Sequence, residues 1–131
     1  MDPDNASMAD FICDFCLRPW ADDRPMVEGH RGSLICSDCL TLAFDELWNR
    51  LAGAHADRAC TLCLEQRREA CWSPQTWPPA GPGVVPNLPI STAPPLACKR
   101  CTKQSTVMLE RDPDSNWKRP APSQRPTDSN P

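Results

Sequence analysis

The sequence is poor in the residues that build a large hydrophobic core. Of its 131 residues only three are Phe, whereas sixteen are Pro. Leu, Ile and Val are sparse, and proline-rich stretches separate them. A unit of this size buries too little apolar surface to offset its conformational entropy, so we expect a metal or disulfides to stabilise the fold.

The sequence also lacks a secretory signal and a membrane-spanning stretch. It begins Met1-Asp2-Pro3, without the basic and apolar regions of a signal peptide. No segment approaches the roughly 18 apolar residues that a membrane helix needs. We therefore expect a cytoplasmic protein with no membrane partner. In that reducing compartment, paired cysteines are more often metal ligands than disulfides.

The net charge of −3 is unevenly distributed. Residues 1–56 hold ten acidic and four basic side chains, a net of −6, whereas residues 57–131 hold seven acidic and ten basic ones, a net of +3. A zinc ion bound by four thiolates would add a further −2. This balance disfavours nucleic acid as a partner.

Eight of the nine cysteines form four Cys-x-x-Cys turns, here called knuckles. One such turn aims two sulfurs at a single ion, so two knuckles complete the tetrahedron that structural zinc prefers. The spacing predicts Zn²⁺ as cofactor, with one ion more firmly indicated and a second expected. The predicted ligands are Cys13, Cys16, Cys36, Cys39, Cys60, Cys63, Cys98 and Cys101.

The order of the knuckles favours two sequential sites. Nineteen residues between Cys16 and Cys36 suffice for a hairpin that returns the chain. The second site needs a loop of 34 residues between Cys63 and Cys98, which is tolerable because closure entropy grows only logarithmically with length. A cross-braced arrangement is less favoured, because twenty residues separate Cys39 from Cys60.

Three further residues are candidate ligands. We expect Cys71 to be a small buried or partly exposed thiol on a helix over residues 64–72, although it could replace one ligand of the second site. His30 and His55 are expected to be surface histidines, because each site already has four sulfurs.

Residues 10–53 are predicted to form the first compact unit. Strands over residues 26–28 and 33–35 flank a Gly-bounded turn and predict a hairpin. Helical periodicity follows Cys39, with Ser37 or Asp38 as the N-cap and Gly53 past the end. The apolar face of this helix is Leu40, Ala43, Phe44, Leu47 and Leu51. The order of knuckle, hairpin, knuckle and helix is that of a treble-clef zinc finger.

The predicted fold is therefore a small metal-stabilised α+β protein with a treble-clef-like first unit. Residues 57–110 form a second, zinc-ribbon-like module, with an ordered piece over 98–110. Its insert, residues 73–97, holds eight prolines and should be extended or disordered. Residues 1–9 and 111–131 are expected to be disordered ends.

Residues 11–51 resemble the N-terminal four-cysteine zinc-binding domain of ClpX, the unfoldase of the Clp protease. The resemblance rests on Phe11-Ile12-Cys13-Asp14-Phe15-Cys16, Arg24-Pro25-Met26-Val27-Glu28-Gly29 and Leu34-Ile35-Cys36-Ser37-Asp38-Cys39-Leu40. It implies zinc binding by Cys13, Cys16, Cys36 and Cys39, dimerisation, and capture of adaptor or substrate proteins. The family usually has Gly where this chain has Leu17, and no phosphate-binding loop of the ATPase module is present.

These features favour a zinc-binding protein-interaction module, with an exposed patch of Leu42 and Trp48 as the expected homodimer interface. Alternatively, both side chains widen the core face. Two other functions are weighed: a zinc-ribbon nucleic-acid-binding or regulatory protein, supported mainly by Lys99, Arg100, Lys103 and Arg111, and a thiol redox enzyme. The redox function is disfavoured, because the sequence lacks the βαβ pattern in which a redox Cys-x-x-Cys motif usually occurs. Four-sulfur sites are closed, so neither an enzyme activity nor a small-molecule substrate is expected.

Overall fold

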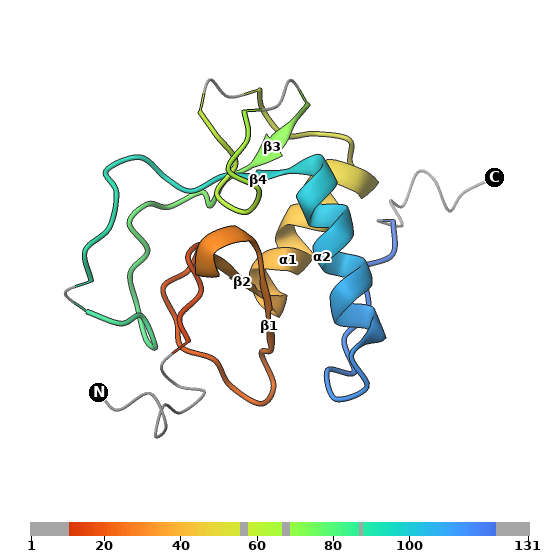
Figure 1. Ribbon diagram of the computed structural model, residues 1–131, viewed down its shortest axis with the longest axis horizontal. Helices are drawn as coiled ribbons and strands as arrows, with labels where there is room; N and C mark the ends of the chain where they lie inside the picture. Colours follow the sequence, from red (N-terminus) through yellow and green to blue (C-terminus); the bar gives the residue numbers. More distant parts are fainter. Residues whose placement is uncertain (1–10, 56–57, 67–68, 87, 123–131) are drawn as a thin grey trace, which may run out of the picture.

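The computed structural model describes residues 11–55, 58–66, 69–86 and 88–122. The expected frayed start, residues 1–9, lies outside these ranges. The described part is a small α+β fold with two antiparallel two-stranded sheets and two α-helices (Figure 1). Its elements are β1 (Met26–Glu28), a 3₁₀ turn (His30–Gly32), β2 (Leu34–Cys36), α1 (Ser37–Phe44), a π-helical turn (Asp45–Asn49), β3 (Cys71–Trp72), β4 (Ala97–Cys98) and α2 (Lys99–Arg111).

The first half contains the predicted hairpin and helix. Strand β1 pairs antiparallel with β2, with Met26 opposite Cys36 and Glu28 opposite Leu34. Helix α1 follows β2 without a loop, and its N-cap is Cys36. The predicted caps, Ser37 and Asp38, are therefore wrong, because both residues already lie inside the helix.

The end of this helix also differs from the prediction. After the π-helical turn, Leu51 adopts a φ of +53° and is 72% exposed, so it does not join the buried face. Leu40, Ala43, Phe44 and Leu47 are buried as expected. Gly53 is needed for a close approach: a Cβ there would lie 2.5 Å from Leu47 Cδ2 and 3.0 Å from the Cys71 carbonyl oxygen.

The second half contains no helix over residues 64–72 within its described positions. Leu64 has a φ of +64°, and Cys71 and Trp72 form β3, which pairs with β4. The predicted helix is therefore wrong. The left-handed turn at Leu64 interrupts any helical pattern. The later helix is present, as α2 occupies residues 99–111 of the piece expected to be ordered.

The proline-rich segment, residues 73–97, is irregular up to Ala97, where β4 begins. It forms a long excursion on one side of the molecule (Figure 1). Within it, Trp77 Nε1–H donates to the Ser91 carbonyl oxygen (3.0 Å). Val85 N–H reaches the Leu17 carbonyl oxygen (2.8 Å), so this segment lies against the first knuckle.

The chain after α2 returns to the first half. Trp117 Nε1–H donates to Thr41 Oγ1 of α1 (3.0 Å). Arg119 donates to both carboxylate oxygens of Glu110, which lowers the pKa of that carboxyl group to about 2. Residues 111–122 of the expected tail are thus in contact with the fold, and residues 123–131 lie outside the described ranges.

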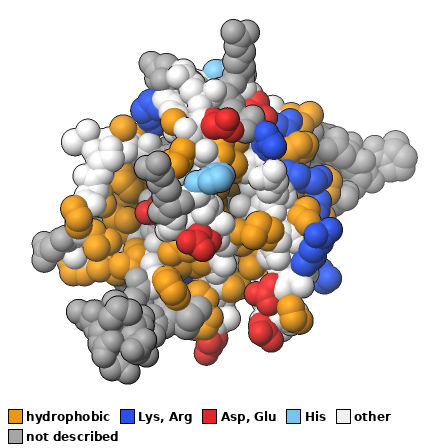
Figure 2. Space-filling view, in the orientation of Figure 1, with side chains coloured by type: hydrophobic (Ala, Val, Ile, Leu, Met, Phe, Trp, Pro, Cys, Tyr) orange, Lys and Arg blue, Asp and Glu red, His pale blue; other side chains and the backbone are white. Residues whose placement is uncertain are grey.

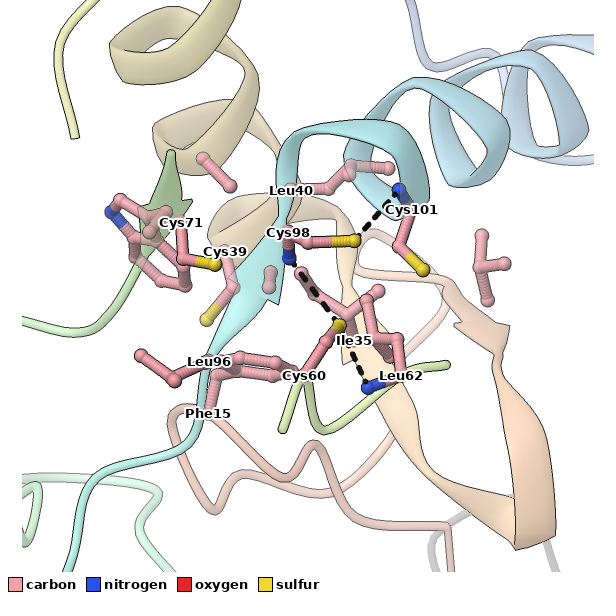
Figure 3. Close-up of a cluster of buried hydrophobic side chains, with 14 of the residues drawn as sticks. Phe15, Ile35, Cys39, Leu40, Cys60, Leu62, Cys71, Leu96, Cys98 and Cys101 are labelled. Carbon is pink, nitrogen blue, oxygen red and sulfur yellow. Dashed lines mark hydrogen bonds between the residues drawn. The ribbon is translucent and has the colours of Figure 1, made fainter. Parts of the chain in front are cut away.

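Both halves contribute to a single buried cluster (Figure 3). Helices α1 and α2 pack side by side (Figure 1). The Phe15 and Trp72 rings lie 5.6 Å apart, and His30 N–H donates to the Leu62 carbonyl oxygen (2.7 Å). The two predicted modules therefore share one core.

The two halves also repeat the same plan. A knuckle precedes an antiparallel strand pair, and the second strand ends on a cysteine that caps a helix: Cys36 before α1 and Cys98 before α2. The short turn over residues 29–33 in the first half corresponds to the proline-rich segment in the second. Ser37 N–H donates to the Pro25 carbonyl oxygen, and Lys99 N–H to that of Ala70, at equivalent positions.

Replacement of one buried leucine should therefore destabilise the whole fold. We expect Leu40→Ala to lower the free energy of unfolding by about 2–5 kcal/mol, because it opens a cavity in the shared core. Leu42→Ala, on the same helix but 59% exposed, should change it by no more than about 0.5 kcal/mol. Denaturant unfolding of the metal-loaded chain measures both. Two separate transitions, of which Leu40→Ala shifts only one, would contradict a shared core.

Candidate metal centres

The structure brings the eight predicted ligands together in two groups of four. Within each group, all four sulfurs lie within 4.8 Å of one another. The groups are those of the sequential arrangement, and the cross-braced alternative is not found in the described residues. The first group is Cys13, Cys16, Cys36 and Cys39, and the second is Cys60, Cys63, Cys98 and Cys101.

The distances between the sulfurs fit a tetrahedral metal site. Zn–S bonds of about 2.3 Å give a tetrahedron with edges of about 3.8 Å. The Sγ–Sγ distances are 3.8 Å for Cys13–Cys39, 3.6 Å for Cys16–Cys36 and 3.9 Å for Cys63–Cys98. All nine cysteines are free thiols, and a disulfide would need about 2.05 Å between sulfurs. The donor set therefore suits a soft divalent ion.

Backbone amides surround one sulfur of each group. Cys13 Sγ accepts hydrogen bonds from Phe15 N–H (3.4 Å) and Cys36 N–H (3.3 Å). Cys60 Sγ accepts the equivalent pair from Leu62 N–H and Cys98 N–H, both at 3.3 Å (Figure 3). Such donors favour the thiolate form, which is the form that binds a metal.

A second pair of hydrogen bonds joins each first knuckle to the leucine that stands two residues before the second knuckle. In the first half, Asp14 N–H donates to the Leu34 carbonyl oxygen (2.9 Å), and Leu34 N–H donates to Asp14 Oδ2 (2.7 Å). In the second half, Thr61 and Leu96 exchange the same two bonds, at 2.8 and 3.0 Å. The side chains of Asp14 and Thr61 thus make equivalent hydrogen bonds, and these bonds hold the two knuckles of each half at the distance that a metal site requires.

Each first knuckle closes through a leucine in the left-handed region. Leu17 has a φ of +59° and Leu64 a φ of +64°. Their amides donate to the carbonyl oxygens of Cys13 (2.9 Å) and Cys60 (2.8 Å). This conformation favours glycine. Leu17 and Leu64 thus adopt a turn that glycine would form with less strain.

The thiols of each group perturb one another strongly. Burial raises the pKa of Cys13, and hydrogen bonds to Cys13 raise that of Cys39. Hydrogen bonds from the neighbouring thiols lower the pKa of Cys16 and of Cys60. Four sulfurs this close cannot all carry a charge without a cation, so a divalent ion is what allows the whole group to deprotonate.

Cys71 belongs to neither group. It lies in β3, opposite Cys98, and is only 6% exposed. Its Sγ–H donates to the Glu69 carbonyl oxygen (3.7 Å), and burial raises the pKa of the thiol. In the repeat its place corresponds to that of Met26, opposite Cys36. Cys71 is thus a buried packing thiol, as expected, although on a strand and not on a helix.

The two histidines belong to neither sulfur group. Both His30 and His55 are exposed, as predicted, and neither is part of a metal-ligand group among the described residues.

Sequence reasoning missed the internal repeat. Its signal is present in the residues: both first knuckles read Cys-x-apolar-Cys-Leu, ending at Leu17 and Leu64, and a leucine stands two residues before both Cys36 and Cys98. The unequal lengths between the knuckles conceal the match.

The chain matches no protein-family model, and no curated protein or solved structure is significantly similar to it. The resemblance to the ClpX zinc domain therefore remains an expectation from the quoted residues. In the part of the chain that the structure describes, no helix has the length and apolar character to cross a membrane.

The two left-handed leucines allow a matched test. Leu64 is 47% exposed, so Leu64→Gly should keep stability unchanged or raise it by up to about 1 kcal/mol, through relief of backbone strain. Leu17 is 7% exposed, and Leu17→Gly should cost about 1–2 kcal/mol, because lost burial outweighs that relief. Denaturant midpoints of the metal-loaded variants measure both. Equal losses would show that the conformation of Leu64 is not strained.

Proposed function

We propose that the chain is a zinc-stabilised protein-interaction module with two structural Zn²⁺ ions. The observation that carries this proposal is the arrangement of eight sulfurs in two groups, with all four sulfurs of a group within 4.8 Å of one another and three of the pairs at 3.6 to 3.9 Å. Zinc is the metal that such closed four-thiolate sites most often hold. The ions supply the cohesion that a core with few large apolar side chains lacks.

The proposed role of the metal is structural and not catalytic. A catalytic zinc keeps one coordination position open for water or substrate, whereas four thiolates fill the tetrahedron. The neighbouring cysteine thiols are then shielded ligands, which also argues against thiol redox chemistry. A reducing compartment such as the cytoplasm would keep them in this form.

We further propose that both halves are treble-clef-like zinc fingers. Each has the order of knuckle, strand pair, knuckle and helix, and the equivalent hydrogen bonds at Asp14 and Thr61 support the same assignment for the second half. Binding of adaptor or substrate proteins, as the resemblance to the ClpX zinc domain implies, fits such a scaffold because zinc fingers present rigid surfaces on little chain.

Leu42 and Trp48, the two residues of the expected homodimer patch, lie in different surroundings in this fold. Leu42 is exposed, but Trp48 packs against α2, where its Nε1–H donates to the Lys99 carbonyl oxygen (3.0 Å). We propose that the internal pairing of the two halves takes the place of a dimer through Trp48, and that the module works as one chain.

Native mass spectrometry tests the metal content and the oligomeric state together. We expect a monomer with two zinc ions, and chelation should unfold the chain, because metal binding and folding are coupled. Cys39→Ser should lose one ion or fail to fold, whereas Cys71→Ser, a change of the same kind outside both groups, should keep two. Wild-type chain that is folded without metal, or that carries disulfides, would refute the proposal.

A further inference from the structure

Helix α2 carries a face that combines cations with an aromatic ring. Lys99 Nζ lies 4.4 Å from the centroid of the Trp48 ring, and Lys103 Nζ lies 5.0 Å from it. Arg100 is exposed on the first turn of the same helix. We call these four residues the α2 basic face. Lys and Arg side chains gather along the edge of the molecule over α2 (Figure 2).

The ring beneath these cations is held in place. Trp48 Nε1–H donates to the Lys99 carbonyl oxygen (3.0 Å), and the ring stacks on Phe44 with 6.4 Å between centroids. Because Trp48 is fixed on two sides, its ring positions the two ammonium groups that lie over it. Binding of a partner here therefore costs less lysine side-chain entropy than binding to two freely rotating lysines would cost.

One carboxylate lies beside this face: Glu69 Oε1 accepts from the Arg100 backbone N–H (3.2 Å) at the start of α2. Among the described residues, no ion pair involves Lys99 or Lys103, whereas Arg119 is paired with Glu110 at 2.6 Å. From residue 99 to residue 109, α2 has three basic side chains and no acidic one. With three cations and one neighbouring carboxylate, the face thus keeps a net positive charge in a chain whose net charge is −3.

The metal site does not explain these basic residues. Both α1 and α2 start on a four-sulfur group, so the internal repeat provides a direct comparison. In α1 the positions of Lys99, Arg100 and Lys103 are occupied by Ser37, Asp38 and Thr41. A four-thiol site at a helix start therefore does not require cations, and the helix dipole disfavours them in the first turn.

We propose that the α2 basic face binds an acidic segment of a partner protein, with carboxylates on Lys99, Arg100 and Lys103 and an apolar side chain at the edge of Trp48. This inference rests on the proposed protein-interaction function. A short acidic peptide fits a small group of cations. A nucleic-acid strand would extend beyond them towards a chain that is acidic overall and that gains negative charge with each bound zinc.

The test compares two double variants with the same change in net charge. Lys99→Gln/Lys103→Gln alters the face, and Arg111→Gln/Lys118→Gln removes two exposed cations beyond it. Binding of a fluorescein-labelled peptide of alternating Glu and Leu residues to the zinc-loaded full chain is followed by anisotropy at low salt. We expect the first variant to weaken binding by about tenfold and the control to leave it nearly unchanged.

Zinc content and circular dichroism of all three proteins separate the possible failures. A wild-type chain without zinc contradicts the proposed function itself. Zinc-loaded wild type that does not bind the peptide, or equal weakening by both variants, overturns only this inference. Tighter binding of a labelled oligothymidylate than of the peptide, lost in the first variant alone, would also overturn it, because the face would then be a nucleic-acid site.

Discussion

Hydrogen bonds from backbone amides to a single sulfur organise each half of this molecule. Cys13 Sγ accepts from Phe15 in its own knuckle and from Cys36 at the start of α1, and Cys60 Sγ does the same with Leu62 and Cys98. One atom thus fixes a turn, the end of a strand and the start of a helix. These bonds strengthen when the acceptor is an ionised thiolate, so a bound cation that keeps the sulfurs deprotonated would strengthen the whole arrangement.

The buried side chains connect these two centres and do not enclose them separately. Phe15 from the first half meets Trp72 from the second, and α1 lies against α2. Each half alone would expose the inner face of its helix, which is mainly apolar in α1 and carries Thr and Ser side chains beside Leu109 in α2. Pairing the halves within one chain buries both faces, which is how a sequence with three Phe residues still forms a continuous core.

The sequence was sufficient to predict the two groups of four cysteines, the hairpin and most of the buried positions of α1, because Cys-x-x-Cys spacing and helical periodicity are local signals. The helix predictions were wrong at Leu51 and over residues 64–72. Leu51 and Leu64 adopt left-handed backbone conformations, which residue propensities do not predict. The packing of Trp48 against Lys99 could not be predicted, since 51 residues separate them along the chain. The repeat escaped notice because a short turn in one half corresponds to a long segment in the other.

The short turn over residues 29–33 and the proline-rich segment differ in length because they approach the opposite half to different extents. A Cβ at Gly29 would lie 2.7 Å from the Leu62 carbonyl oxygen, so the short turn is wedged against the second knuckle. The proline-rich connection makes the reciprocal contact with Leu17 through Val85 but runs over the surface on both sides of it. Extra residues would therefore be tolerated in only one of the two connections, and new sequence can accumulate there without separating the paired halves.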